Sequence, residues 1–231
     1  MRPRTRIVTI TAAAVLAAGA TTALLLANPS SSSPAAGSPS TPPATTSPSG
    51  PTSASPATTS PSGPAPLTTQ GLTYVNRTWG DPKTELGVIV PIPSTWSMTK
   101  VSTFESRFTS PNKLWNLRLN GVLAKPQPRA TYVTQKLAAL RSTPDFHLIS
   151  RTHSAAKATS EVFAGVTFQY TTLTYTYTDP ARGTRLVVDR FVTIDDATTT
   201  GFELAASGRP EDLPALRTIT TKVTLGYVRL P

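Results

Sequence analysis

Side chains that could perform acid–base or metal chemistry are few in this sequence. The two histidines, His147 and His153, lie six residues apart, and an imidazole pair can bind a metal ion or carry a catalytic proton. Two surface histidines near a loop are the commoner meaning of this pattern, because no further ligand follows at a metal-binding spacing. Asp195 and Asp196, followed by Glu203, could hold Ca²⁺, but an acidic pair at a strand end is more often a solvated turn. We therefore predict no catalytic residue, no metal ligand and no cofactor.

Nucleophilic catalysis finds equally little support. The chain has no cysteine, and its many serines and threonines form no Gly-x-Ser-x-Gly motif. Without cysteine the protein can form no disulfide and cannot carry a lipid on an N-terminal cysteine. The folded part must therefore be stabilised by its core alone.

The N-terminus indicates export. Arg2, Arg4 and Arg6 precede an uncharged and mostly apolar run at 7–27. A cleavable signal has an apolar stretch of about 7–15 residues and a spanning helix needs about 20, so this length favours a signal-anchor with residues after 27 outside the cell. The alternative is a secreted protein, since Ala18-Gly19-Ala20 offers a small-x-small cleavage pattern.

Residues 28–66 predict a disordered linker. The segment consists of Ser, Pro, Thr, Ala and Gly with one Asn, and the stretch PATTSPSGP occurs at 43–51 and again at 56–64. Such a composition buries too little apolar surface to offset the entropy of ordering, and proline keeps the chain extended. We expect a spacer, with O-glycosylation as an alternative and docking of a polyproline-binding module as the least favoured one.

The charge balance indicates an affinity for anions without naming a partner. The net charge is +10, and about +7 remains beyond the three N-terminal arginines. Outside a cell the anionic partners would be wall polymers, lipid headgroups or nucleic acid. The basic residues form no run and no basic-aromatic platform, so we expect no specific nucleic-acid recognition. Asn76-Arg77-Thr78 matches an N-glycosylation triplet, which is a weak signal.

Residues 67–231 predict one folded α+β domain. Apolar runs and alternation indicate strands at 86–90, ended by Pro91-Ile92-Pro93, at 114–123 and at 146–151. Apolar residues at i, i+3, i+7 and i+10 predict a helix over 130–141. A second helix is expected from Pro210 to near Gly226.

A long hairpin is expected over 166–194, with its turn at Asp179–Gly183 and Gly183 at positive φ. The buried parity changes near Thr171-Thr172, which predicts a bulge or strong twist there. A further strand should cover 202–206. The expected core comprises Trp115, Leu117, Leu119, Val133, Leu137, Leu140, Val188, Val192, Phe202 and Leu204.

This order of elements, together with the stretch VIVPIPSTW, resembles the PsbP-like α/β/α sandwich and exported actinobacterial proteins of the LpqN type. The resemblance covers roughly residues 72–227. It implies an antiparallel sheet packed with helices and a non-catalytic adaptor role, and it carries over no site residues. This chain departs from the lipoprotein members because it lacks their anchoring cysteine.

Two functions from different classes follow. The first is a monomeric, non-catalytic module at the outer face of the membrane that binds an envelope protein, a wall polymer or a small ligand. The second is an extracytoplasmic hydrolase with a dispersed site, in which His147 or His153 works with Asp195, Asp196 or Glu203. We favour the first.

Overall fold

The computed structural model describes residues 64–195 and 197–230, which form two antiparallel sheets and two α-helices. The expected signal or anchor at 1–27, nearly all of the expected linker, and Asp196 lie outside the described residues. Within the described part, no helix is both long enough and apolar enough to cross a bilayer.

Seven strands form the larger sheet, and the predicted long hairpin supplies the two neighbouring strands between its central strand and one edge strand. In spatial order the strands are β3 (Ser97–Lys100), β4 (Glu105–Thr109), β5 (Asn116–Asn120), β9 (Phe202–Gly208), β8 (Gly183–Ile194), β7 (Thr167–Asp179) and β6 (His147–Lys157). The hairpin turn is closed as predicted, with Gly183 at a φ of +69°. The expected hairpin and the strand after it are therefore confirmed.

Three strands form a smaller sheet in the order β1 (Tyr74–Gly80), β2 (Gly87–Pro93) and β10 (Val228–Leu230). Our prediction that the prolines end β2 is wrong, since the strand continues through Pro91 to Pro93. Beyond Ile89, β2 pairs only with β1. One edge of the strand is thus open where the prolines lack an N–H, and proline is tolerated at such an edge.

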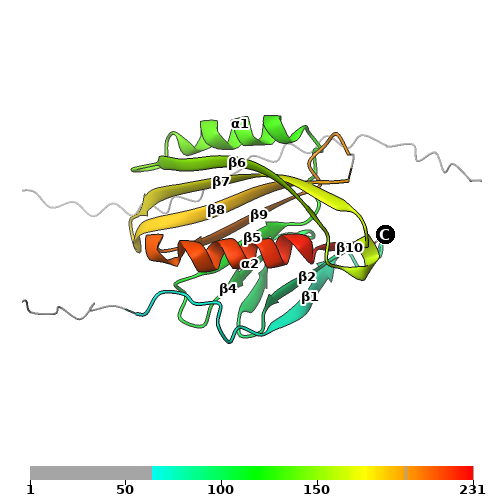
Figure 1. Ribbon diagram of the computed structural model, residues 1–231, viewed down its shortest axis with the longest axis horizontal. Coiled ribbons are helices and arrows are strands. Elements are labelled where there is room, and N and C mark those ends of the chain that lie inside the picture. The colour runs from blue at the N-terminus through cyan, green and yellow to red at the C-terminus, as the bar shows by residue number, and fades with distance from the viewer. Residues whose placement is uncertain (1–63, 196, 231) are drawn as a thin grey trace, which may run out of the picture. The chain divides into compact units, whose positions relative to one another are not determined.

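The two helices cover opposite faces of the larger sheet (Figure 1). Helix α1 (Arg129–Leu140) lies over β7 and β8, and its Val133 packs with Val187 and Phe191 of β8. A 3-10 turn η2 (Pro210–Asp212) leads into α2 (Leu213–Leu225), and another, η1 (Glu161–Phe163), precedes β7. Residues Val188 and Val192, of the other parity of β8, belong to the core that includes α2. Both predicted helices are confirmed, and α1 matches its predicted range within one residue at each end. The predicted start of the second helix at Pro210 is a 3-10 turn, and α2 itself begins at Leu213.

The small sheet packs on the α2 side of the large one. Trp79 of β1 contacts Phe108 of β4 edge-to-face with ring centroids 5.6 Å apart. Val90 and Ile92 of β2 are fully buried in the same core as Leu117 of β5. The domain is therefore a partly covered large sheet with a helix on each face and a second sheet, which the sequence did not predict.

The change of buried parity along β7 has a different cause from the one we predicted. The pairing of β7 with β8 runs without a break from Phe168 to Asp179, so no bulge interrupts it. Tyr170 belongs to the core beneath α2, whereas Leu173 belongs to the core beneath α1. Each parity is buried where its own face is covered by a helix, and the predicted bulge is wrong.

Most of the predicted core residues are buried as expected. Leu117, Leu119, Val133, Val188, Val192, Phe202 and Leu204 are all 0% exposed. Trp115, Leu137 and Leu140 are only half-buried, because Trp115 precedes β5 and the two leucines lie at the rim of the small core under α1.

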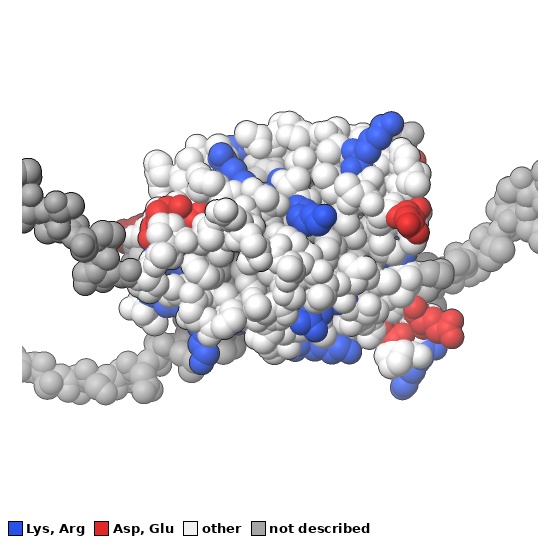
Figure 2. Space-filling view, turned by 60° about the horizontal axis from the view of Figure 1, so that its bottom comes forward, with Lys and Arg blue, Asp and Glu red and all other residues white. Residues whose placement is uncertain are grey.

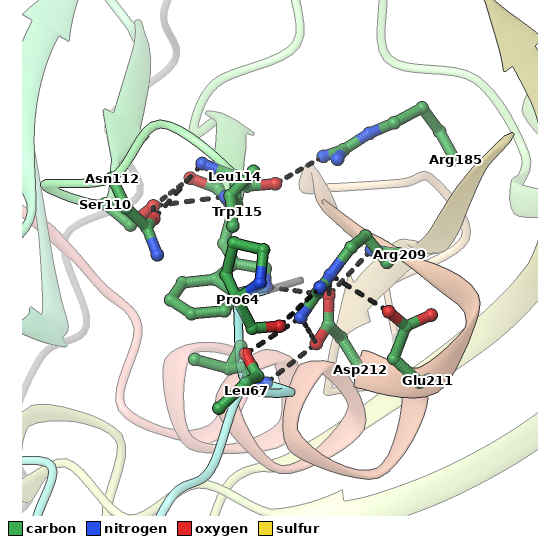
Figure 3. Close-up of polar contacts among 11 residues, drawn as sticks. Pro64, Leu67, Ser110, Asn112, Leu114, Trp115, Arg185, Arg209, Glu211 and Asp212 are labelled. Carbon is green, nitrogen blue, oxygen red and sulfur yellow. Dashed lines mark hydrogen bonds and ion pairs between the residues drawn. The ribbon is translucent and has the colours of Figure 1, made fainter. Parts of the chain in front are cut away.

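The fully buried carboxylate of Asp212 joins three distant parts of the chain (Figure 3). Its oxygens accept hydrogen bonds from the backbone N–H of Leu67, the indole Nε1 of Trp115 and the backbone N–H of Arg209, each at 2.7 Å. The Arg209 guanidinium also donates to the carbonyls of Pro64 and Ala65. The last residues of the expected linker thus lie against the domain.

Candidate functional site

The two histidines do not form a site together. Both are exposed on β6, an edge strand of the large sheet. A register shift between Leu148 and Ser150 places His147 opposite Thr176 and His153 opposite Thr171. Those two threonines are five residues apart on β7 and so face opposite sides of the sheet. The bulge therefore separates two imidazoles that an unbroken strand would have put on one face.

The acidic candidates are also apart from one another and from the histidines. Glu203 lies on β9, three strand positions from the β6 histidines, which corresponds to about 14 Å. Asp195 follows the end of β8, four residues beyond the partner of Glu203, Phe191, or about 13 Å along the strand. Asp196 lies outside the described residues. Among the described residues, no three His, Cys, Asp or Glu side chains are grouped to hold a metal ion.

Glu203 belongs instead to a buried ionic cluster under α1. The Lys136 ammonium lies 2.8 Å from Glu203 Oε1 and 3.1 Å from Asp189 Oδ2. The contact with Asp189 lacks hydrogen-bond geometry, and both oxygens of this fully buried carboxylate have no hydrogen-bond partner among the described residues. One ammonium thus faces two carboxylates.

The protonation of this cluster follows from that imbalance. Burial raises the pKa of Asp189 to about 6, because the attraction of Lys136 offsets only part of the lost hydration. For Lys136, burial lowers the pKa, but the two facing carboxylates outweigh it and raise the pKa above its ordinary value. Lys136 therefore stays charged. Its ammonium offsets negative charge from the two carboxylates on the strands beneath α1.

Beyond α1, no other described helix packs on the same face of the sheet, which is polar there. A hollow of about 520 Å³ opens there beside the turn that joins β4 to β5. It is lined by Ser97, Arg107, Thr109, Ser110, Pro111, Lys113, Asn116, Arg118, Tyr177, Arg182 and Ser207. We call this site the cationic hollow, because four of the lining residues are Lys or Arg and none of them is acidic.

The β4–β5 turn beside the hollow is held rigidly by polar contacts (Figure 3). Ser110 Oγ donates to the side-chain oxygen of Asn112 at 2.7 Å and accepts from the backbone N–H of Trp115 at 3.1 Å. The guanidinium of Arg185, a buried residue on β8, donates to the carbonyl of Leu114 at 2.7 Å. Within this turn Lys113 adopts a φ of +61°, which is unusual for a residue other than glycine.

Arg185 also connects the turn to the wall of the hollow. It is 1% exposed, and its guanidinium lies 3.4 Å from Ser207 Oγ, a lining group. Its Nε has no hydrogen-bond partner, and it makes no ion pair, among the described residues. Burial lowers the pKa of Arg185, and the neighbouring charge of Arg182 adds to this effect. A buried positive charge without an ion-pair partner among the described residues therefore lies beneath the hollow.

A second buried arginine, Arg190, lies on the opposite face of the sheet, where neighbouring side chains surround its guanidinium. Arg190 donates to the hydroxyls of Thr172, Thr224 and Thr221, and its guanidinium lies 4.2 Å from the ring centre of Tyr170. Burial lowers the pKa of Arg190 to about 10. These contacts explain it as a structural residue.

The remaining basic side chains are dispersed. On the face shown in Figure 2, Lys and Arg are spread mostly singly among uncharged residues, as the sequence suggested. In the hollow, by contrast, four cationic side chains line one concave surface.

Sequence reasoning did not find the cationic hollow. Arg107 and Arg118 are far from runs of charge, and their juxtaposition depends on the register of β4 with β5. One signal was visible: Arg185, Asp189 and Arg190 interrupt an otherwise apolar strand. Charged residues in such a run are rarely buried without a reason.

Comparison with known proteins finds likenesses of structure and none of sequence. No protein-family model matches the sequence, and no curated protein is similar to it in sequence. The solved structures to which it is similar include cyanobacterial PsbP, LpqN and Mog1p. Cyanobacterial PsbP from Synechocystis is 12% identical with a TM-score of 0.43, covering 72% of this chain and 98% of its own.

The other two structures come from a mycobacterium and a yeast. LpqN of Mycobacterium tuberculosis, involved in cell envelope biogenesis, is 17% identical with a TM-score of 0.41, covering 70% of this chain and 92% of its own. The Ran-binding protein Mog1p of Saccharomyces cerevisiae is 6% identical with a TM-score of 0.40, covering 68% and 96%. The expected resemblance to PsbP and LpqN is confirmed as a likeness of structure.

Proposed function

We propose that this protein is a non-catalytic binding module displayed on the outer side of the cell membrane. Segment 7–27 would anchor it and the Pro/Ser/Thr-rich segment would act as a spacer, as their composition suggests. The observation that carries the binding role is the cationic hollow: a concave polar surface on the uncovered half of a sheet face, beside a turn fixed by buried contacts.

The arrangement is better suited to binding than to catalysis. The lining offers hydroxyl, amide and cationic groups, and no carboxylate or imidazole that could act as a general base is among them. The buried Lys136–Asp189–Glu203 cluster is paired within itself, and Asp189 is inaccessible. The exposed imidazole of His153 lies 2.9 Å from Thr171 Oγ1, a contact that needs no catalytic role.

Cell fractionation tests the location. We expect the full-length protein to sediment with membranes, to keep its initial sequence, and to be digested by protease added to intact spheroplasts. A soluble protein whose N-terminus is Thr21 or Asn28 would show that the segment is a cleaved signal.

Binding to isolated cell envelopes tests the role. The domain with His147→Ala and His153→Ala should bind envelopes as well as the unmodified domain, since neither histidine contributes to the hollow. Loss of binding, or of any hydrolytic activity, in these variants with the fold preserved would contradict the non-catalytic proposal.

A further inference from the structure

We propose that the cationic hollow binds the phosphate group of a small organic phosphate, either free in solution or as a lipid headgroup. This inference rests on the proposed function, because it names the ligand class of the same surface. It is argued from three features of the hollow: facing like charges, cations without partners, and a strained turn that carries one of them.

Like charges face each other across the floor of the hollow. Arg107 of β4 is the direct cross-strand partner of Arg118 of β5. Directly opposed residues have Cβ atoms about 4.5–5.5 Å apart, and like charges at such positions destabilise a sheet. An anion bound between the two guanidiniums would convert this repulsion into attraction.

The hollow keeps an excess of positive charge after its internal ion pairs are counted. Arg118 pairs with Glu105, and Arg182 pairs with Asp179 at 2.7 Å. Arg107 and Lys113 are exposed and make no ion pair with any described residue. Two free cations are therefore presented to solvent on one concave surface.

The turn that carries Lys113 has a strained backbone conformation at that residue. A φ of +61° is disfavoured for lysine, and strained residues of this kind persist where surrounding contacts hold them. Here the contacts come from Ser110 and from Arg185, which the structure buries without any described carboxylate partner. The buried guanidinium both fixes the turn and adds positive potential behind the hollow.

Phosphate fits this set of donors better than carboxylate does. A phosphate monoester presents three non-bridging oxygens in a tetrahedral arrangement, which can meet guanidiniums from two strands and an ammonium from a turn at once. A carboxylate presents two coplanar oxygens and would satisfy one guanidinium fork. The hydroxyls of Ser97 and Thr109 and the amide of Asn116 could bind hydroxyl groups of the organic part.

Calorimetric titration of the full-length protein in neutral detergent tests the proposal. The soluble probe is glycerol 3-phosphate, with glycerol as its uncharged control. The lipid probe is phosphatidic acid, also a phosphate monoester, mixed into the micelles, with diacylglycerol as its uncharged control. We expect saturable binding of at least one phosphate probe that weakens as salt is added.

The double variant Arg107→Gln/Lys113→Gln should weaken that binding at least tenfold. Its matched control is Lys83→Gln/Arg229→Gln, which removes one lysine and one arginine from exposed positions outside the hollow. The control should bind as the unmodified protein does. All four residues are exposed, so both variants should fold, and their melting temperatures verify this.

Each outcome of this experiment either supports or overturns the phosphate proposal. Binding of glycerol 3-phosphate that is lost in the hollow variant supports the proposal with a soluble ligand. Binding of phosphatidic acid alone, lost in the same variant, supports it with a lipid headgroup. Absence of binding, or equal weakening by both variants, overturns it. If phosphate binding fails while the domain still binds cell envelopes, the phosphate inference is wrong and the proposed binding function stands.

Discussion

Replacing Asp212 by Asn should destabilise the domain strongly although the two side chains have nearly the same shape. The carboxylate is 0% exposed and accepts three N–H bonds of 2.7 Å, from Leu67, Trp115 and Arg209. An amide keeps one accepting oxygen and turns an NH₂ group toward the donors that the other oxygen had satisfied. At least one buried N–H then faces another donor, and the Arg209 guanidinium loses its buried partner.

The expected loss is about 3–5 kcal/mol, the usual cost of breaking a buried charged pair, with each bond to a charged acceptor contributing about 1.5–3. For a domain of this size, that corresponds to a fall of about 6–20 °C in melting temperature. The matched control is Glu211→Gln. Glu211 pairs with the same Arg209 at 3.1 Å, but its side chain is 47% exposed, so its loss should cost about 0–1 kcal/mol.

The pH dependence gives a second check on the same residue. Burial alone would raise the pKa of Asp212, but the N–H donors of Leu67 and Arg209 and of the Trp115 indole outweigh it and lower the pKa. The stabilisation is therefore present above the unfolded pKa of about 3.9 and is lost as pH falls through the folded value. Thermal unfolding followed by circular dichroism from pH 7 to pH 2 measures both effects. A melting temperature for Asp212→Asn equal to that of Glu211→Gln at pH 7 would refute the reasoning.

Three further predictions concern the core, the N-terminal segment and the cluster under α1. Leu117→Ala should cost about 2–5 kcal/mol in denaturant unfolding and Leu137→Ala clearly less, because the first is 0% exposed and the second half-buried; equal losses would contradict this. Deleting residues 1–63 should leave the melting temperature unchanged, whereas a drop of several degrees would mean that they pack on the domain. Asp189→Asn should gain stability relative to the unmodified protein between pH 4 and pH 7, since a pKa raised to about 6 contributes stability that is lost as pH rises through that value. A difference independent of pH would show that Asp189 does not titrate there.

Long elements with a clear period could be predicted from the sequence. The stripe of α1 records a neighbour on one side of the helix, and the largely apolar run of β8 records neighbours on both faces of the strand. Short polar strands could not be predicted in this way. Strands β3 and β4 carry little apolar alternation of their own, as their sequences SMTK and ESRFT show. They form because β5 gives β4 a partner and β4 in turn pairs with β3, and that information lies outside each segment.

The candidate site depends on register, which periodicity does not reveal. The one-residue shift near Ser150 moves His147 to the opposite face from His153 and removes an apparent metal pair. In β4 and β5 the register brings Arg107 against Arg118, which creates a charged surface from two isolated arginines. In both cases the residues are visible in the sequence, and their chemistry is decided by pairing.

The position of the hollow follows from the dimensions of the fold. Seven strands about 4.8 Å apart span about 29 Å, whereas one helix is about 10–12 Å wide and covers about two strands. On one face α2 and the small sheet together cover the apolar residues of β4, β5, β8 and β9. On the other face α1 is the helix that packs against β7 and β8, and beyond it β9, β5, β4 and β3 carry polar residues. The broad polar surface that a ligand could occupy on this domain therefore lies beside α1, at the cationic hollow.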